Sequence, residues 1–223
     1  MEWLQGGPFL EVSFLLQLKE DKMNTIKDII KKLFDSNIKI QIVNSNIDEI
    51  IGNFEKGYLY DKEEPLSRKH SLFLNLYVNL TRKRKAVLYI EKVSSNSILV
   101  DFWFYGSEFD AIEWNQIGVK EEEYIDFVNF LIELFKIYEF KVGGIMYEND
   151  VTDFFDLDDI FPNEGYRFEN ISPDFLQKQR SSTPISVVWN QQYGTFKDIP
   201  YRIMKISDNG IIVLIEDLET ASL

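Results

Sequence analysis

Residues 72–105 read LFLNLYVNLTRKRKAVLYIEKVSSNSILVDFWFY, and this stretch decides the fold. Apolar side chains recur at every second position in its first third, which is the period of a half-buried β-strand. Polar joints at 82–85 and 94–97 separate three β-rich runs, and short joints of this kind connect neighbouring antiparallel strands. The sequence therefore predicts a three-stranded antiparallel meander with strands at 72–80, 86–93 and 98–105.

Upstream of this meander, residues 9–43 form a strand–helix–strand pattern. Residues 9–18 are apolar and follow a Gly-Gly-Pro sequence, which is typical of a buried strand. Residues 24–36 carry their apolar side chains at helical spacing, and residues 38–42 alternate isoleucine with polar residues. We expect residues 44–71 to be a mostly irregular connection, because glycine and proline interrupt them.

Downstream, residues 98–147 repeat the same order of strand, helix and strand. Residues 121–140 are apolar over most of a helical circumference, which is typical of a helix buried in the core. A strand at 142–147 follows, then polar loops at 162–184. Further strands are expected at 185–189, 201–206 and 211–215, the last two joined by the turn signal Asp208-Asn209-Gly210.

These elements predict an α+β fold with a mainly antiparallel sheet and two main helices, at 24–36 and 121–140, packed on one face. The two strand–helix–strand units cover residues 9–43 and 98–147. We expect a single α+β domain over residues 1–223, with any subdivision placed near 162–184.

The composition is that of a chain that buries a large core and carries a strong negative charge. Hydrophobic residues make up 45% of the 223, and 24 Lys and Arg against 37 Asp and Glu give a formal net charge of -13. Nucleic-acid binding normally needs a basic face, so we expect no nucleic-acid partner. The same charge attracts basic proteins. The absence of cysteine excludes disulfides, thiol catalysis and thiolate metal sites.

The sequence also bears on location. No apolar run approaches the roughly 18 residues that a membrane-spanning helix needs. The first apolar stretch carries Glu11 and lacks the basic start of a signal peptide. We therefore expect a cytoplasmic protein with no membrane partner.

Recognisable catalytic motifs are missing from the chain. It contains no GxxxxGKS/T, GxGxxG, GxSxG or HExxH pattern. The one histidine, His70, has no nucleophile or companion ligand nearby in sequence, so an ordinary surface or edge histidine is expected. Gly143 and Gly144 are interpreted as helix-ending glycines. The sequence predicts no catalytic residue, no cofactor-binding residue and no metal ligand, and hence a protein that is not an enzyme.

The densest acidic segment spans residues 148–159. Carboxylates at such spacing can bind Ca²⁺ or Mg²⁺ or act as an acid/base pair, but the glycine and final glutamate of an EF-hand loop are missing. Aromatic and aliphatic residues interleave with the acids, which favours a solvated amphipathic face over a contact with a basic partner. The candidate contact residues in this segment are Asp150, Asp153 and Asp156.

A second acidic segment, at 101–114, is rich in aromatic residues. Strand alternation is expected to put Phe102 and Phe104 in the core and to leave one or two aromatics at an edge of the sheet. Tryptophan is enriched in the hot spots of protein interfaces, and carboxylates around it suit a basic groove. The candidate contact residues here are Trp103, Glu108, Asp110, Glu113 and Trp114.

In size, acidity and missing catalytic groups the chain is similar to bacterial immunity proteins and antitoxins. That resemblance implies an intracellular protein that inhibits or sequesters a basic partner, such as a toxic enzyme or nuclease, by covering its basic cleft. One alternative is an enzyme that uses the carboxylates of 148–159, with or without a divalent metal. A second alternative is a phage or structural assembly subunit.

Overall fold

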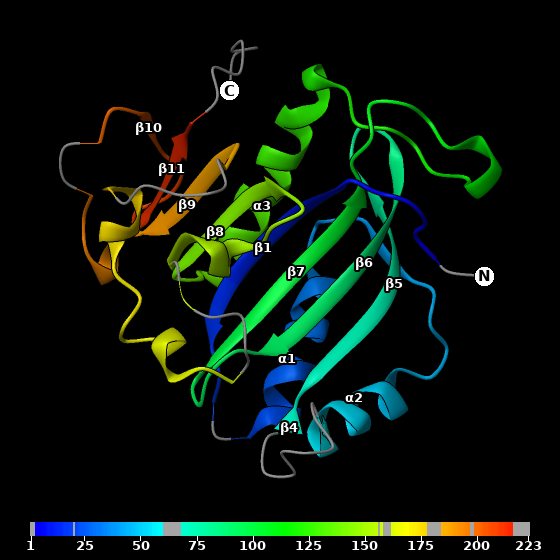
Figure 1. The fold of residues 1–223 in the computed structure, drawn as a ribbon, viewed down its shortest axis with the longest axis horizontal. Coiled ribbons are helices and arrows are strands. Elements are labelled where there is room, and N and C mark those ends of the chain that lie inside the picture. Colours follow the sequence, from blue (N-terminus) through cyan, green and yellow to red (C-terminus); the bar gives the residue numbers. More distant parts are fainter. Residues whose placement is uncertain are drawn as a thin grey trace.

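The computed structural model of this protein describes residues 3–19, 21–59, 68–155, 157, 162–177, 184–196 and 199–215. The described residues contain one sheet of nine strands in the order β10-β11-β9-β8-β1-β7-β6-β5-β2, and every neighbouring pair in it is antiparallel. Three helices lie on one side of this sheet (Figure 1). The predicted α+β fold with a mainly antiparallel sheet is therefore confirmed.

The first strand of the chain lies in the middle of the sheet. β1 (Phe9–Gln17) pairs along its whole length with β7 (Ser97–Tyr105) and on its other side with β8 (Val142–Tyr147). The unit at 98–147 is thus split by β1, since its two strands run parallel to each other on either side of it. The unit at 9–43 connects β1 to β2 (Ile40–Ile42), which forms one edge of the sheet.

The predicted meander is present, but its first turn is shorter than expected. β5 (Ser71–Asn79) pairs with β6 (Lys83–Lys92), which pairs with β7. Residues 82–85 are therefore not a turn, because β6 already begins at Lys83. Strand alternation then turns Arg84 into the interior, where it is 3% exposed and lies 3.0 Å from Glu123.

The helices bury their apolar stripes against one face of the sheet. α1 (Lys22–Asp35) begins at Asp21, whose carboxylate accepts a hydrogen bond from the Asn24 backbone at 2.9 Å. α3 (Tyr124–Tyr138) follows a 3₁₀ turn at Glu121–Glu123. Both pack against the alternate residues of the central strands that face them, among them Val12, Phe14, Val100, Phe102 and Phe104.

Part of the predicted irregular connection is a third helix. α2 (Ile47–Lys56) carries Ile51 and Phe54 into the same core, and it ends at Gly57, whose φ is +63°. A two-stranded ribbon of β3 (Tyr58–Leu59) and β4 (Arg68–Lys69) follows. The prediction of a mostly irregular stretch was wrong for residues 47–56, where four apolar residues at helical spacing outweigh Gly52.

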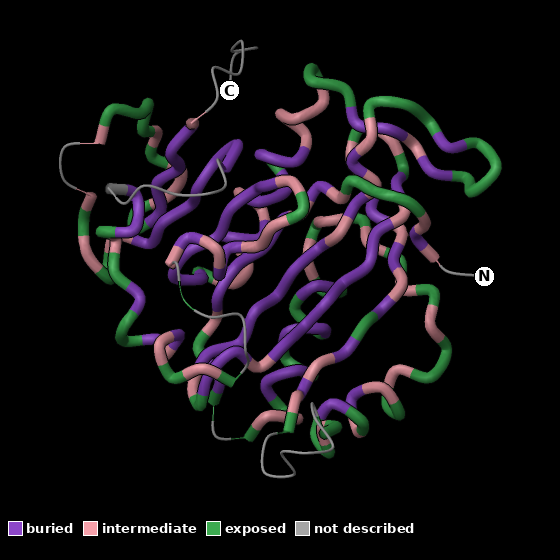
Figure 2. Tube along the Cα trace, in the orientation of Figure 1, coloured by how far each residue is buried: buried purple, intermediate pink, exposed green. Residues whose placement is uncertain are grey.

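The opposite face of the sheet is covered over one half only. There, 3₁₀ turns at Val151–Phe155, Glu164–Tyr166 and Pro173–Gln177 pack on β8, β9 (Ser186–Asn190) and β11 (Gly210–Leu214). β10 (Arg202–Lys205) forms the outer edge. Buried backbone runs through the central strands on both sides of this second core (Figure 2).

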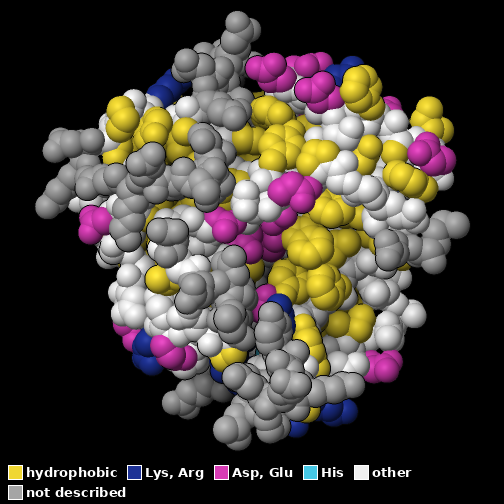
Figure 3. Space-filling view, viewed as in Figure 1, with side chains coloured by type: hydrophobic (Ala, Val, Ile, Leu, Met, Phe, Trp, Pro, Cys, Tyr) yellow, Lys and Arg dark blue, Asp and Glu magenta, His cyan; other side chains and the backbone are white. Residues whose placement is uncertain are grey.

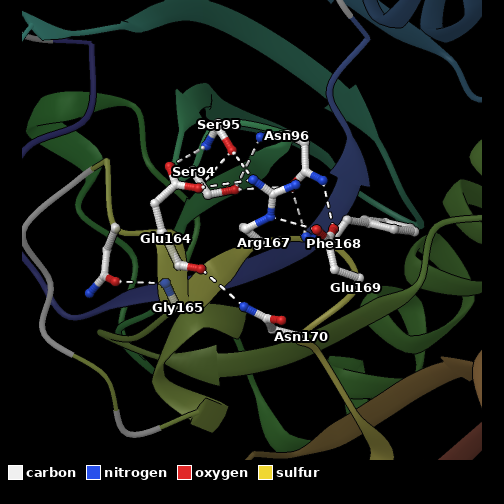
Figure 4. A network of polar contacts seen from close by, with 10 residues as sticks. Ser94, Ser95, Asn96, Glu164, Gly165, Arg167, Phe168, Glu169 and Asn170 are labelled. Carbon is white, nitrogen blue, oxygen red and sulfur yellow. Dashed lines mark hydrogen bonds and ion pairs between the residues drawn. The ribbon is translucent and has the colours of Figure 1, made fainter.

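A polar network fastens this covering segment to the turn between β6 and β7 (Figure 4). Glu164 accepts hydrogen bonds from the backbone and the hydroxyl of Ser95, at 3.0 and 2.7 Å. Asn96 accepts from the Phe168 backbone at 2.9 Å and donates to Glu169 at 2.7 Å, while Arg167 pairs with Glu169 at 2.5 Å. These bonds hold the cover at one end of the sheet.

Gly143 and Gly144 lie within β8 and do not end a helix, so that interpretation was wrong. α3 ends at Glu139, which takes the left-handed conformation with a φ of 47°. The rings of Phe140 and Phe154 pack where side chains of the two glycines would lie. Glycine is needed here for close packing and not for a turn.

Two further expectations concern the chain as a whole. Among the described residues, no helix combines the length and the hydrophobicity that crossing a membrane requires. β8 and β9 pair with each other although the segment 162–184 separates them in sequence. The single-domain organisation stays a prediction.

Candidate functional site

Four aromatic side chains form a cluster on the uncovered half of the sheet. Phe73 on β5 faces Tyr89 on β6 across the strand pair, with ring centroids 4.6 Å apart. Trp103 on β7 contacts both, at 5.7 and 5.3 Å, and stacks on Phe9 of β1 at 6.1 Å. Phe73 is 49% exposed, although Tyr89 is largely buried. We call these residues the aromatic cluster: Phe9, Phe73, Tyr89 and Trp103.

Strand alternation explains why aromatic residues gather on this face. In β7 the residues on either side of Trp103, Phe102 and Phe104, point to the helices and are fully buried. The sequence-based expectation for these two residues is confirmed, and Trp103 lies on the opposite face. Figure 3 shows hydrophobic side chains collected over this part of the sheet, with acidic side chains along one side of them.

Three carboxylates from separate elements meet beside the aromatic cluster. Glu11 of β1, Asp101 of β7 and Asp150, which follows β8, each place one carboxylate oxygen within 4.8 Å of the others. Asp101 is 1% exposed, while Glu11 and Asp150 are partly exposed. We call these three residues the carboxylate trio. Glu148 and Asp153 add two further negative charges close to Glu11.

Hydrogen bonds hold the acidic side chains in place. The Trp103 indole N–H donates to Oδ2 of Asp101, which joins the aromatic cluster to the trio. Oδ1 of Asp150 accepts from the backbone and the hydroxyl of Thr152, at 2.7 and 2.6 Å. Oγ of Ser13, on β1, accepts from the Val151 backbone at 2.8 Å. The segment that carries Asp150 is thus fixed to the strand that carries Glu11.

The electrostatics of the trio favour proton uptake or a bound cation. Burial raises the pKa of Glu11 to about 7; a hydrogen bond with Asp101 opposes this, and the charges of Asp150, Glu148 and Asp153 add to it. Burial also raises the pKa of Asp101 well above its ordinary value, and the negative charges of Glu11 and Asp150 raise it further. Carboxylates arranged in this way hold a proton near neutral pH unless positive charge compensates them.

The structure divides the residues proposed from sequence between two places. Trp103, Asp150 and Asp153 lie at the aromatic cluster and the trio. Asp156 lies outside the described residues. The remaining four belong to the loop at 106–120, which connects β7 to the turn before α3 and projects beyond the sheet (Figures 1 and 2): Glu108, Asp110, Glu113 and Trp114.

This loop presents apolar side chains at its tip and is braced at its base. Phe109 and Ile112 are 78% and 85% exposed, and Trp114 is 38% exposed. Asp110 accepts a hydrogen bond from the Gly118 backbone at 2.9 Å, so this candidate contact residue also shapes the loop. The Gln116 side chain exchanges two hydrogen bonds with the backbone of Gln5, each 2.7 Å long.

Sequence reasoning missed half of the site. Glu11 was considered only against a signal peptide, and Asp101 only as part of an acidic stretch. Phe73 was placed on the correct outer face, without a role, while Phe9 and Tyr89 were not considered as surface residues. The available signal was a single acid inside each of two otherwise apolar strands, because a carboxylate in a buried strand needs a specific reason.

His70 is part of the fold and not of this site. It is buried, where a surface or edge position was expected, and its Nδ1 lies 2.8 Å from the carbonyl oxygen of Phe54 near the end of α2. Burial lowers its pKa, and the nearby charges of Lys22, Lys92 and Arg68 add to this effect against the Phe54 carbonyl. These contacts give His70 the role of joining α2 to β5.

Comparisons with known proteins assign no family. No family model matches the chain, and no curated protein matches it. Among solved structures, it is similar to the Pseudomonas aeruginosa T6SS protein PA0821, with a TM-score of 0.38 and 9% sequence identity. The similarity covers 93% of this chain and 65% of that one, so the chain spans less than two thirds of its neighbour's length. At these values the similarity does not bear on function.

Proposed function

We propose that this protein binds a basic partner protein and thereby inhibits or sequesters it, as immunity proteins and antitoxins do, and that it is not an enzyme. The observation that supports this most directly is the aromatic cluster on the uncovered half of the sheet, with carboxylates beside it. Exposed aromatic side chains next to charged groups are typical of the centres of protein interfaces.

The charge of the surface indicates what kind of partner fits. The formal net charge of -13 attracts a basic protein from a distance, and Glu11, Glu148, Asp150 and Asp153 concentrate negative charge beside the aromatic cluster. A partner with an apolar surface bordered by lysine and arginine would match both properties. The loop at 106–120 offers a second contact region with the same combination of exposed apolar tip and acidic residues.

The experiment compares two phenylalanine variants that differ in face and not in exposure. Phe73, in the aromatic cluster, is 49% exposed, and Phe34, on α1 at the other side of the sheet, is 48% exposed. Wild type, Phe73→Ala and Phe34→Ala are each immobilised and challenged with lysate of the source organism at low and at moderate salt. Retained proteins are identified by mass spectrometry, purified, and measured for affinity and for their own activity.

We expect one basic protein, bound by wild type and by Phe34→Ala and released by salt, because ions screen charge attraction. Its affinity for Phe73→Ala should be about 10-fold to 100-fold weaker, the size of a hot-spot loss. Its activity should fall when wild type is added. A retained partner that is acidic, or that binds all three proteins alike, would contradict the proposal.

A further inference from the structure

The buried member of the carboxylate trio needs an explanation that partner binding does not supply. Asp101 is 1% exposed, so its carboxylate is out of reach of a protein docked on the aromatic cluster. Acidic side chains are almost never buried unless they are paired or coordinate a metal. The question is therefore what compensates Asp101.

One of the two Asp101 oxygens is compensated and the other is not. Oδ2 accepts the indole N–H of Trp103. Oδ1 is buried and receives no hydrogen bond from the part of the chain that the structure describes. The charged groups of the described residues that act on Asp101 are the carboxylates of Glu11 and Asp150. Oδ1 must therefore share a proton with Glu11 or meet a cation.

The spacing and chemistry of the trio suit a metal ion. All three ligands are carboxylates, the class of ligand that Ca²⁺ and Mg²⁺ prefer. Oxygens bound to Ca²⁺ stand about 2.3–2.6 Å from the ion, so two of them are at most about 5 Å apart. The trio meets this limit, because one oxygen of each residue lies within 4.8 Å of the others. Mg²⁺ would draw the oxygens closer, since its bonds are about 2.0–2.1 Å long.

The surrounding bonds prepare the three ligands for one ion. Glu11 and Asp101 sit on neighbouring paired strands, with Ser13 opposite Asp101 and Trp103 opposite Glu11. Asp150 is held by Thr152, and the Val151 backbone bonds to Ser13. Outer groups of this kind orient ligands before the metal arrives.

We propose that Glu11, Asp101 and Asp150 bind one hard divalent cation, Ca²⁺ in preference to Mg²⁺, between β1, β7 and the segment after β8. This goes beyond the proposed function and differs from the sequence-based expectation of no metal ligand. The bound ion would neutralise the buried carboxylate and tie three separate elements together.

The test uses the full chain, stripped of metal with a chelator and dialysed. CaCl₂, MgCl₂ and MnCl₂ are titrated in turn by calorimetry, and melting temperature is followed with each salt. We expect one Ca²⁺ per chain, a rise in melting temperature, and weaker binding of Mg²⁺. Glu11→Gln and Asp101→Asn should each weaken Ca²⁺ binding at least tenfold. Asp208→Asn, in a fully exposed turn next to β10, should leave it unchanged.

Terbium luminescence gives a second measurement that identifies the location. Tb³⁺ replaces Ca²⁺ at oxygen sites and is excited through a nearby indole, and the Trp103 indole is bonded directly to Asp101. We expect luminescence in wild type that Ca²⁺ displaces, and its loss in Trp103→Phe, which should still bind Ca²⁺ by calorimetry.

Two outcomes would overturn the metal site. One is wild type that binds none of the three ions at millimolar concentration, which would leave a proton shared by Glu11 and Asp101 as the compensation. The other is Ca²⁺ binding that survives in both Glu11→Gln and Asp101→Asn. Neither outcome touches the proposed function, since no partner protein enters the experiment.

Discussion

Gly144 is a residue whose missing side chain decides how the second core packs. A Cβ at this position would lie 2.5 Å from the ring of Phe154, which is 1% exposed and stacks on Phe175. We expect Gly144→Ala to lower the free energy of unfolding by about 1–3 kcal/mol, because the ring has no free space into which to move. Urea denaturation measures this change.

The same substitution at Gly52 is the matched control with the opposite sign. Gly52 lies inside α2, and a Cβ there would meet no heavy atom within 4 Å. Gly52→Ala should raise the free energy of unfolding by about 0.5–1 kcal/mol, since alanine is the better helix former. Equal effects of the two substitutions would show that packing against Phe154 does not matter.

His70 gives the fold a dependence on acid. Because burial holds its folded pKa below the ordinary 6.5, the unfolded chain binds a proton that the folded chain has already released. Stability from this residue is therefore complete above pH 6.5 and is lost as the pH falls from there towards the folded pKa. The loss is at most about 1.4 kcal/mol per pH unit.

A variant isolates this effect from the other titrating groups. His70→Gln keeps a side chain that can donate to the Phe54 carbonyl but does not titrate. Urea denaturation of both proteins at pH 7.5, 6.5 and 5.5 should show wild type losing stability relative to the variant as the pH falls. A difference that stays constant over this range would rule out the role assigned to His70.

At the scale of elements, Glu123 joins the start of α3 to the strand β6. Its carboxylate accepts two hydrogen bonds from Arg82, each 2.6 Å long, and pairs with the buried Arg84 at 3.0 Å. Both arginines also donate to carbonyl groups at the base of the 106–120 loop. One side chain thus supports a strand, a helix and a loop.

Removing the charge of Glu123 should therefore be costly. We expect Glu123→Gln to destabilise the protein by about 3 kcal/mol, because Arg84 would remain buried without its partner. Glu133→Gln breaks an exposed pair with Lys136, 2.6 Å long, and should cost less than about 0.5 kcal/mol. Urea denaturation of the two variants compares the sites, and similar losses would contradict this account.

Local patterns in the sequence predict most elements but not the carboxylate trio. Alternation in residues 72–105 reveals the meander, because each strand faces the core on one side only. The same period places Phe102 and Phe104 inside and Trp103 outside. Glu11, Asp101 and Asp150 lie on three different elements, and no local period states that β1 inserts between β7 and β8. Without that strand order the three acids have no relation to one another.

Helix α2 and Arg84 were mistaken for a related reason. Gly52 and the later Gly57 suggested an irregular chain, although Gly57 only ends the helix. A run of four basic residues suggested a solvated turn, but strand β6 sends Arg84 inward to meet Glu123. In both cases tertiary contacts decided against the local signal.

At the scale of the whole molecule, the sheet connects the regions before and after residues 162–184. Trp103 reports on the open half of the sheet and Trp189, fully buried in β9, on the covered half. We expect variants that retain only one of these tryptophans to unfold in urea with the same midpoint. Cooperative unfolding of one sheet predicts this result. Separate midpoints would instead place a domain boundary near 162–184.

The central position of β1 has a consequence for how the protein is made. Residues 9–17 leave the ribosome well before their neighbours at 97–105 and 142–147 are translated. For most of synthesis the strand FLEVSFLLQ therefore has no sheet to join. Pairings between distant parts of a chain form slowly, and an apolar strand that waits for them is prone to aggregate. The strand order thus makes the nascent chain a client for chaperones until β8 has been synthesised.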